Sequence, residues 1–530
     1  MSVNDQTVPG AALSDEQQLH QLGYAQELRR RMSGFSNFAV SFTIISILSG
    51  CLTLYYFGME MGGPAIIVWG WVLVGIMTLM VGLSMAEVCS SFPTAGGLYY
   101  WAAKLAPGKS GPVWSWFTGW FNFLGQVAVT AGIDFGAALF INFLLSLWFN
   151  YSVTTHWHTI VIYAIVLLVH GIMNQFGIRL VALLNDISVW WHIIGVLIIV
   201  AAVTFGLNSG AHAVSSTGAH YVVHHASATF VFTGLENLSG FSIGWWYILP
   251  IGLLMAQYTF TGYDASAHMT EETHNASTAG PRGIVMSILV SLIAGWVLLV
   301  GLTFAIQRAN YVGEATAVVA PGQIWLDAIG RSGAELLLLV VIGAQLFCGM
   351  SSVTANSRMI YAFSRDGALP ASKVWHRVNK RTRTPTNAIW LAAGGALILG
   401  LPYIWNSVAY AAVTSIATIG LYVAYVAPTY LRLRQGENFK RGPWHLGRWS
   451  YVVGWTAVVW VVIIFFLFML PQFGPIGWKT FNYAVVAVAV VIGFAGIYWL
   501  VSARKWFTGP KVQGTPEELA AIEHELTTTG

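Results

Sequence analysis

Three residues that could bind a solute, Thr261, Gly262 and Asp264, lie in the middle of an apolar stretch of the chain. They belong to the segment 258–273, YTFTGYDASAHMTEET, which closely follows the apolar run 244–256. A helix in contact with lipid cannot leave polar side chains and loosened backbone groups without hydrogen-bond partners. An interrupted helix that lines a cavity avoids this cost, because its freed N–H and C=O groups face a bound solute. The segment therefore predicts a binding site within a membrane.

A second apolar run is interrupted in the same way. Ser46, Ser49 and Gly50 lie near the centre of the run ISILSGCLT. Helix amino ends at such breaks present free N–H groups to a carboxylate, and helix carboxyl ends present carbonyl groups to an ammonium. A zwitterionic amino acid fits this field, whereas the alternative is that Gly50 and Gly262 only allow helices to pack closely. The candidate substrate-binding residues at the two breaks are Ser46, Ile47, Leu48, Ser49 and Gly50, together with Phe260, Thr261, Gly262, Tyr263 and Asp264.

Polar side chains also recur at helical spacing within four other apolar runs. Residues three, four or seven apart lie on one face of a helix, so each set forms a stripe. A stripe that faced lipid would be costly, and four stripes together predict a shared polar interior around a solute cavity. For any single residue, hydrogen bonding between packed helices is the alternative. The stripes are Asn122, Gln126, Thr130 and Asp134; Asn185, Ser188 and His192; Gln345, Ser352 and Asn356; and Tyr410, Thr414, Thr418 and Tyr422, and Gln126 joins the candidate substrate-binding residues.

The composition places these runs in a polytopic membrane protein. Only 9% of the residues are charged, against about a quarter in soluble domains, while 56% are hydrophobic and the mean hydropathy is +0.65. The predicted fold class is all-α with twelve transmembrane helices, most of them long enough for the roughly 20 residues that a bilayer requires. The predicted spans lie near 36–57, 64–89, 113–149, 158–177, 178–206, 244–268, 283–307, 334–363, 386–401, 405–431, 450–471 and 480–502. Residues 36–503 are expected to form a single transporter domain, with polar cytosolic tails at 1–35 and 504–530.

The distribution of cations predicts the orientation of these spans. If the amino terminus is cytoplasmic, all of the 25 Lys and Arg residues except Arg308, Arg331 and Lys479 fall on the inner side. Cytoplasmic loops carry the excess of Lys and Arg in membrane proteins. We therefore expect both termini in the cytoplasm and a location in the plasma or inner membrane. The net charge of +4 reflects this orientation and not a nucleic-acid partner.

Other functional classes lack the residues that they require. The sequence has no nucleophile–base pair, phosphate-binding loop or HExxH-type metal motif, so an enzyme is not expected. The loop 208–243 contains four histidines without regular ligand spacing, and neither a metal site nor a cofactor is expected. A channel is a remote alternative, because it would need a continuous polar lining in place of two central breaks.

Several motifs resemble signatures of the amino acid–polyamine–organocation superfamily. They are MAEVCSSFPTAGGLY at 85–99, GYDASAH at 262–268, EET at 271–273, SR at 357–358, RDGALP at 365–370 and TP at 384–385. In this order they are most similar to the amino acid/choline transporter subfamily. The resemblance extends from about Arg31 to Trp506.

The resemblance implies a five-plus-five inverted-repeat fold with discontinuous first and sixth helices, two additional helices and alternating access. The two breaks agree with this fold, because spans one and six begin successive five-span blocks and enter the membrane from opposite sides. Members of the subfamily are permeases for amino acids, 4-aminobutyrate, choline and polyamines. We therefore expect a secondary active transporter that imports amino acids or related compounds such as 4-aminobutyrate together with a proton. A polyamine or choline permease and an amino acid exchanger are the alternatives.

The resemblance also singles out a residue in the fifth span. Some members carry a lysine there, at the place where sodium-coupled relatives bind the ion, and aligning the motif that begins at Asn185 puts His192 at this place. Because imidazole titrates near physiological pH, we predict that His192 couples transport to protons. A hydrogen-bonded core histidine is the alternative. Sodium assistance through Ser351, Ser352 or Thr354 is left open.

Acidic residues continue beyond the second break. Asp264, His268, Glu271 and Glu272 have the spacing i, i+4, i+7 and i+8, which predicts that they lie on one side of an inner half-helix. His268, Glu271 and Glu272 are therefore candidates for an internal gate or a proton path. The alternative is an acidic helix end that pairs with nearby Arg or Lys side chains.

Overall fold

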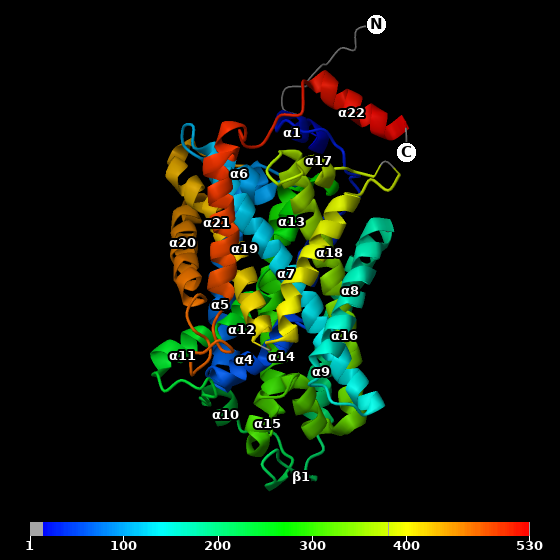
Figure 1. Ribbon diagram of the computed structural model, residues 1–530, viewed down its shortest axis with the longest axis vertical. Coiled ribbons are helices and arrows are strands. Elements are labelled where there is room, and N and C mark those ends of the chain that lie inside the picture. Colours follow the sequence, from blue (N-terminus) through cyan, green and yellow to red (C-terminus); the bar gives the residue numbers. More distant parts are fainter. Residues whose placement is uncertain (1–13, 177, 380, 407, 529–530) are drawn as a thin grey trace.

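The protein is an elongated bundle of helices with both ends of the described chain at the same end (Figure 1). The computed structural model describes residues 14–176, 178–379, 381–406 and 408–528. Helices α1 (Asp15–Gln21) and α22 (Pro516–Thr528) lie together at what we call the tail end. The antiparallel strands β1 (His212–Val214) and β2 (His220–Val222) lie at the opposite end, which we call the hairpin end.

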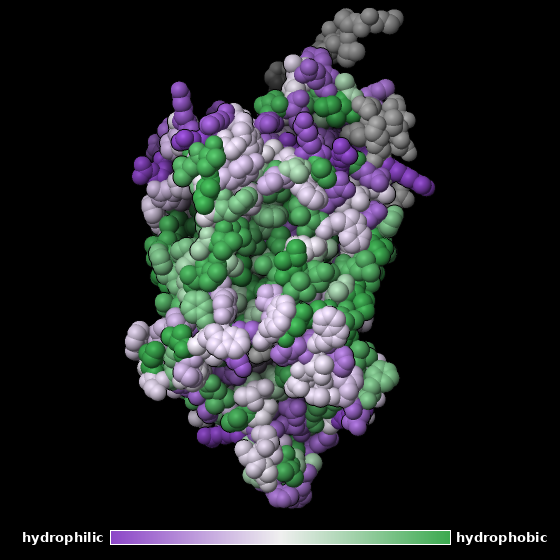
Figure 2. Space-filling view, in the orientation of Figure 1, coloured by the Kyte–Doolittle hydropathy of each residue, from purple (hydrophilic) through white to green (hydrophobic). Residues whose placement is uncertain are grey.

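Within the described residues, eleven segments are long and apolar enough to cross a membrane. Figure 2 shows an apolar belt between two polar ends of the molecule. Large side chains such as Leu197, Phe494 and Ile497 are exposed, and so many exposed apolar side chains are expected only where lipid covers them. The chain is therefore a polytopic membrane protein. The eleven segments are Gly34–Thr53, Ile66–Ser91, Gly111–Phe149, His156–Phe176, Leu180–Phe205, Ala276–Phe304, Ala320–Arg365, Thr386–Ile404, Ala409–Asn438, Gly447–Leu467 and Ala484–Val501.

The predicted sixth span is absent from these segments because it consists of short helices. They are α11 (Trp245–Gly252), α12 (Leu254–Thr259) and α13 (Ala265–His268). Residues 260–264 between α12 and α13 are not helical, and Gly262 has a φ of +90°. The first span is interrupted as well, between α2 (Gly34–Ile45) and α3 (Gly50–Thr53), where Ser46 has a left-handed φ of 40°. Both interruptions lie where polar and small residues enter the apolar runs.

Helix α7 lies in the middle of the bundle and packs against α16 and α19. Helix α14 packs against α5 and against α2, so the first broken span is enclosed by neighbours. Helix α16 changes direction at Gly330, whose φ is 77° and whose ψ is 178°. The bounds of these helices are α5 (Trp71–Ser91), α7 (Gly111–Phe149), α14 (Ala276–Phe304), α16 (Ala320–Arg365) and α19 (Ala409–Gln435).

The remaining elements connect or surround this centre. They are α4 (Tyr55–Glu60), α6 (Gly97–Leu105), α8 (His156–Phe176), α9 (Ile178–Phe205), α10 (Ala228–Thr233), α15 (Tyr311–Ala315), α17 (Ser372–Trp375), α18 (Thr386–Gly400), α20 (Ser450–Leu467) and α21 (Ala484–Val501). The hairpin β1–β2 is a departure from the predicted all-α fold. Its turn ends at Gly218, which has a φ of +83°, and the N–H of Ser215 donates back across the turn to the carbonyl of Ala219 at 2.8 Å.

The segment before α2 is packed against the bundle. Leu19, Tyr24, Leu28 and Met32 are buried. The N–H of Met32 donates to the carbonyl of Glu272 at 2.8 Å, which ties this segment to the chain that follows α13. The amino-terminal segment therefore covers the tail end of the second broken span.

Candidate substrate site

The break between α2 and α3 leaves two backbone donors free. The carbonyl of Ser46 accepts hydrogen bonds from the N–H groups of Ser49 and Gly50, at 2.8 and 3.1 Å. The N–H groups of Ile47 and Leu48, in contrast, have no acceptor among the residues that the structure describes. Consecutive free N–H groups at the amino end of a helix form a site for an anion such as a carboxylate.

Two tyrosines of α19 hold the second break in place. The hydroxyl of Tyr422 donates to the carbonyl of Phe260 at 2.5 Å. The N–H of Gly262 donates to the hydroxyl of Tyr425 at 3.2 Å. These bonds satisfy two of the backbone groups that the break releases, so its conformation is fixed by a neighbouring helix.

A small cavity lies between the two breaks. Of the predicted binding residues, Ser49, Gly50 and Thr261 line it. Its other lining residues are Ile44, Ile45, Val129, Ile133, Tyr258 and Thr259. The space open to a water-sized group is about 10 Å³, roughly what a single water requires. The cavity is therefore closed in this conformation, and it would have to expand to hold any solute larger than a water molecule.

Several of these lining residues were missed by the sequence analysis. Val129 and Ile133 precede the polar residues Thr130 and Asp134 of the α7 stripe, so the apolar neighbours of the stripe and not its polar members reach the cavity. Tyr258 is the first residue of the segment that drew attention to the site. Its buried hydroxyl has no hydrogen-bond partner in the described chain, and it is the kind of group that a solute would satisfy.

Other predicted binding residues lie near the cavity without lining it. The ring of Phe260 packs on that of Trp71 with centroids 4.4 Å apart. The ring of Tyr263 packs on that of Tyr425 at 4.7 Å. Ser46 is buried at the break and is directed toward α9, where it contacts His192.

Asp264 and Gln126 form hydrogen bonds within the protein. The Oδ2 atom of Asp264 accepts from the Nε2 of Gln126 at 2.6 Å and lies 3.3 Å from the Nε2 of His268. Its Oδ1 atom accepts from the hydroxyl of Tyr425 at 2.7 Å. Thr130, in the same stripe as Gln126, contacts a side chain of α16. In this conformation the α7 stripe therefore forms hydrogen bonds between helices, which was the alternative interpretation of the pattern.

His192 of α9 contacts the first break directly. Its Nδ1 lies 2.7 Å from the carbonyl oxygen of Ser188, and its Nε2 lies 2.7 Å from the hydroxyl of Ser46. A carbonyl only accepts, so Nδ1 carries a proton, and Nε2 of the neutral ring accepts from the hydroxyl of Ser46. Protonation of Nε2 would force this hydroxyl to become the acceptor. The charge of His192 is therefore linked to the hydrogen bond of Ser46, the residue of the first break that has a left-handed backbone conformation.

The predicted gate residues do not share one helix face. Helix α13 ends at His268, and Glu271 and Glu272 lie in a separate 3₁₀ turn, Thr270–Glu272. The prediction of a continuous inner half-helix was wrong, because the N–H groups of Glu272 and Thr273 donate to carbonyls three residues back, as in a 3₁₀ turn, and the α-helix does not continue. His268 instead contacts the carbonyl of Ala95 through Nδ1 at 2.9 Å.

Both glutamates form ion pairs that close the tail end. Glu272 accepts from the Nε of Arg358 at 2.9 Å, and both side chains are buried. Glu271 accepts from Arg365 at 3.2 Å and from the N–H of Ala95 at 2.9 Å. This pairing was the alternative in the sequence analysis. We call these two ion pairs the tail-end barrier, because they join the chain that follows α13 to α16 at the tail end of the second broken span.

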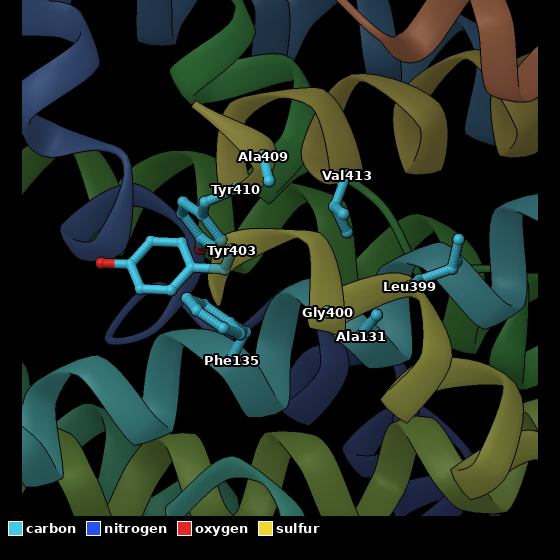
Figure 3. A pocket seen from close by; sticks show the side chains of 8 residues that line it. All are labelled: Ala131, Phe135, Leu399, Gly400, Tyr403, Ala409, Tyr410 and Val413. Atoms are coloured by element: carbon cyan, nitrogen blue, oxygen red, sulfur yellow. The ribbon is translucent and has the colours of Figure 1, made fainter. Parts of the chain in front are cut away.

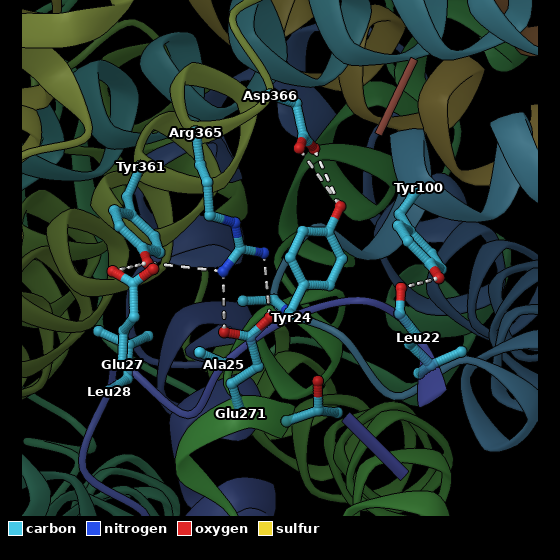
Figure 4. A network of polar contacts seen from close by, with 12 residues as sticks. Leu22, Tyr24, Ala25, Glu27, Leu28, Tyr100, Glu271, Tyr361, Arg365 and Asp366 are labelled. Atoms are coloured by element: carbon cyan, nitrogen blue, oxygen red, sulfur yellow. Dashed lines mark hydrogen bonds and ion pairs between the residues drawn. The ribbon is translucent and has the colours of Figure 1, made fainter. Parts of the chain in front are cut away.

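The amino-terminal segment completes this barrier, as Figure 4 shows. The guanidinium of Arg365 lies over the ring of Tyr24, 3.9 Å from its centroid. The hydroxyls of Tyr24 and Tyr99 both donate to the carboxylate of Asp366, Tyr99 at 2.7 Å. Burial raises the pKa of Asp366 above its usual value, while the neighbouring Arg365 acts in the opposite direction. The carboxyl-terminal tail contributes the N–H of Lys511, which donates to the same carboxylate at 3.0 Å.

Removing one partner of a barrier ion pair is expected to destabilise the protein strongly. Arg358→Ala would leave the buried carboxylate of Glu272 without its cation, which costs about 3–5 kcal/mol. Thermal unfolding of the purified protein in detergent should show this loss, and Glu272→Gln in the same chain should restore part of it. Arg331→Ala is the matched control, because the exposed Arg331–Glu335 pair is expected to contribute less than about 1 kcal/mol. Equal losses for both arginines would contradict the role of the barrier.

Two further cavities lie toward the hairpin end. A cavity of about 500 Å³ is bordered by the exposed residues Thr154 and Thr316. Tyr403 and Tyr410 line it and also line a much smaller space beside Phe135, where the three rings approach one another (Figure 3). The rings of Phe135 and Tyr410 are stacked with centroids 5.6 Å apart. Tyr403 and Tyr410 therefore belong both to the large cavity and to this aromatic group around Phe135.

The three candidate sodium ligands have protein partners. The hydroxyls of Ser351, Ser352 and Thr354 hydrogen-bond to side chains of α9, α7 and α8, respectively. Among the described residues, no group of three or more His, Cys, Asp or Glu side chains could hold a metal ion.

Comparison with known proteins gives one consistent result. The family model described as "Amino acid permease" matches residues 32–494 of this chain. The chain is 44% identical to amino-acid permease BAT1 of Arabidopsis thaliana, over 96% of this chain and 98% of that protein. It is also 44% identical to the BAT1 homolog of Oryza sativa subsp. japonica, over 96% and 97% of the two chains. The GABA-specific permease of Saccharomyces cerevisiae is 34% identical over 94% of this chain and 86% of that protein.

Proposed function

We propose that this chain, which belongs to the amino acid permease family, imports an amino acid or a related compound such as 4-aminobutyrate together with a proton. The chain is a membrane transporter and not an enzyme. The observation that carries the proposed substrate class is the pair of breaks beside one buried cavity, with the free N–H groups of Ile47 and Leu48 at one of them. Transport then proceeds by alternating access to this cavity from the two ends of the bundle.

The charges of the substrate would be held by backbone groups. Its carboxylate would accept hydrogen bonds from the N–H groups of Ile47 and Leu48, and its ammonium would bind carbonyl groups at the carboxyl ends of α2 and α12. None of the described residues that line the cavity is a carboxylate, which favours a zwitterion over a polyamine or choline. The apolar side chains of Ile44, Val129 and Ile133 favour a small aliphatic substrate.

Coupling to the proton would pass through His192 and Ser46. With the ring neutral, the hydroxyl of Ser46 donates to His192; with the ring protonated, the direction of this bond reverses. Ser46 begins the non-helical backbone that supplies the free N–H groups of Ile47 and Leu48. Occupancy of the substrate site and protonation of His192 can therefore influence each other through one hydrogen bond.

We further propose that the tail end faces the cytoplasm and that the chain lies in the plasma or inner membrane. This orientation follows the excess of Lys and Arg in the loops of the tail end. The three short helices α11, α12 and α13 would form a twelfth span beside the eleven long segments. Two inverted halves of five spans, α2–α9 and α11–α19, would then contain the breaks, with α20 and α21 outside them. Packing of α5 on α14, α7 on α16 and α8 on α18 supports this pairing of halves.

Transport by the purified chain in liposomes tests the proposed function. The panel should contain small amino acids, 4-aminobutyrate, choline and putrescine, each offered with an imposed pH gradient, a sodium gradient or neither. We expect saturable uptake of an amino acid or 4-aminobutyrate that requires the pH gradient, with no requirement for sodium. Uptake that occurs only against an internal amino acid would indicate an exchanger. Uptake of putrescine or choline alone would overturn the proposed substrate class.

Tyr258→Phe is expected to weaken substrate binding without weakening the fold. If the free hydroxyl bonds the substrate, its removal should raise KM about tenfold, because the free energy of one hydrogen bond corresponds to about a tenfold change in affinity. Thermal stability should stay the same or rise, because the hydroxyl is buried and has no hydrogen-bond partner among the residues that the structure describes. Tyr163→Phe is the matched control, since its hydroxyl donates to the carbonyl of Ala396 at 2.6 Å. It should lower stability by about 1 kcal/mol and leave KM unchanged, and the reverse pattern would contradict the role of Tyr258.

A further inference from the structure

The large cavity at the hairpin end has a composition different from that of the central site. Its volume of about 500 Å³ is in the range of small-molecule binding sites, roughly 300–1,000 Å³. Its lining includes the side chains of Glu60 and His156 and the rings of Tyr56, Tyr403, Tyr410 and Phe473. Arg and Lys are absent from the described residues that line it.

Glu60, at the end of α4, is the only carboxylate among the described residues of this lining. It is partly buried, and its carboxylate forms no hydrogen bond or ion pair with any described residue. Burial raises the pKa of Glu60 to about 8. A carboxylate that has lost part of its water and gained no partner is costly, and a cation in the cavity would remove this cost.

The aromatic residues give such a cation further favourable contacts. The rings of Phe57 and Phe473 meet edge to face at 5.7 Å, and that of Tyr403 lies 4.7 Å from His156 and 4.6 Å from Phe135. These packed rings have little freedom to move away. Tyr410 also lines the cavity, and its buried hydroxyl has no hydrogen bond of normal geometry among the described residues. Ring faces attract ammonium groups, and a free hydroxyl oxygen can accept from one.

We propose that this cavity is a second binding site, specific for a primary ammonium group on a short carbon chain, which Glu60 binds among the rings of Tyr56, Tyr403 and Tyr410. The class includes amino acids and 4-aminobutyrate, so the physiological role rests on the proposed function. The site would hold the amine end of an incoming substrate before the aromatic group at Phe135 opens toward the central cavity. Binding itself requires neither opening of the central site nor transport.

Protection of an introduced thiol measures binding at this site directly. The three native cysteines, Cys51, Cys89 and Cys348, are fully buried, so Thr316→Cys places a single accessible thiol at the edge of the cavity. The full-length purified variant is labelled with a charged thiol reagent at about pH 8.5, where a good part of Glu60 is ionised. n-Butylammonium is the probe, and n-butanol is the matched neutral compound.

We expect n-butylammonium to slow labelling and n-butanol not to slow it. Glu60→Gln in the Thr316→Cys chain should raise the concentration for half-protection at least about tenfold. Glu335→Gln, which removes a carboxylate outside this cavity, should leave it unchanged. If Glu60→Gln fails to fold, Glu60→Asp provides the comparison, with weaker protection expected because the carboxylate is drawn back from the cavity.

Equal protection by both compounds, or unchanged protection after substitution of Glu60, would overturn the proposed site. The proposed transport function has a separate readout, uptake into liposomes. Protection that depends on Glu60 in a chain that imports no amino acid would support the site and refute the function. Normal uptake without such protection would support the proposed transport function and refute the second binding site.

Discussion

His192→Gln is expected to remove the dependence of uptake on the pH gradient. One proton that moves down one pH unit supplies about 1.4 kcal/mol, enough for a tenfold accumulation of substrate. Glutamine can donate to the carbonyl of Ser188 and accept from the hydroxyl of Ser46, as the neutral ring does. It cannot take up a proton. Accumulation in liposomes under a one-unit gradient should therefore fall from about tenfold to about onefold.

Counterflow of substrate, measured without a pH gradient, distinguishes loss of proton coupling from loss of the folded, active transporter. It should persist within about threefold of the original rate, because the hydrogen bonds at the break are kept. His170→Gln is the matched control: His170 is also buried in a membrane-spanning helix, 3.0 Å from Asp134, but it does not contact the break. Full dependence on the pH gradient in His192→Gln, or its loss in His170→Gln instead, would refute the role of His192.

Gly262→Ala is expected to abolish uptake, with a loss of about a hundredfold or more. The residue has a φ of +90°, which residues other than glycine rarely adopt, and a methyl group there would lie 2.1 Å from the Cγ2 of Ile44. Left-handed backbone costs an alanine about 1–2 kcal/mol, and the clash adds to this. Because Ile44 lines the central cavity, the methyl group would also displace a wall of the substrate site. Initial rates of uptake and thermal unfolding should both be measured.

Gly394→Ala is the matched control for this substitution. It introduces the same methyl group in helix α18, where no described atom apart from the adjoining helix backbone would lie within 4 Å of it. Uptake should be unchanged, and stability should rise by about 0.5–1 kcal/mol, because alanine favours a helix more than glycine does. Uptake that is retained in Gly262→Ala would show that the second break does not need its left-handed glycine, and comparable loss in both variants would show that the loss is not specific to the break.

The membrane-protein class of this chain and the interruptions of two of its helices could be predicted from the sequence, because both depend on local composition. A long apolar segment enters a membrane whatever its neighbours are, and a break costs too much unless a cavity or another helix satisfies it. The runs around Ser46 and Gly262 therefore predicted interrupted helices, and the structure has interruptions at both places. The motifs and the apolar spans predicted an amino acid transporter, and family membership confirmed it.

The partners of the polar residues could not be predicted in this way. Asp264 was placed beside a solute, but in this conformation three side chains from α7, α13 and α19 bind it. Tyr258 has the free hydroxyl at the cavity, although its neighbours in sequence are more polar. Helical spacing defines a face, and only the packing of other helices decides what that face meets.

The sequence by itself determined that the chain is membrane-embedded, that two of its helices break, and which residues lie at the breaks. The tertiary structure decided which of them line the cavity, that the cavity is closed, and that Glu271 and Glu272 form ion pairs with Arg365 and Arg358. Insertion into the membrane depends on the transfer of each apolar segment from water to lipid. A helix break depends on the hydrogen bonds of the backbone groups beside it. Both are therefore properties of nearby residues. Ion pairs such as Glu272–Arg358 join residues 86 positions apart, so they depend on how the whole bundle packs.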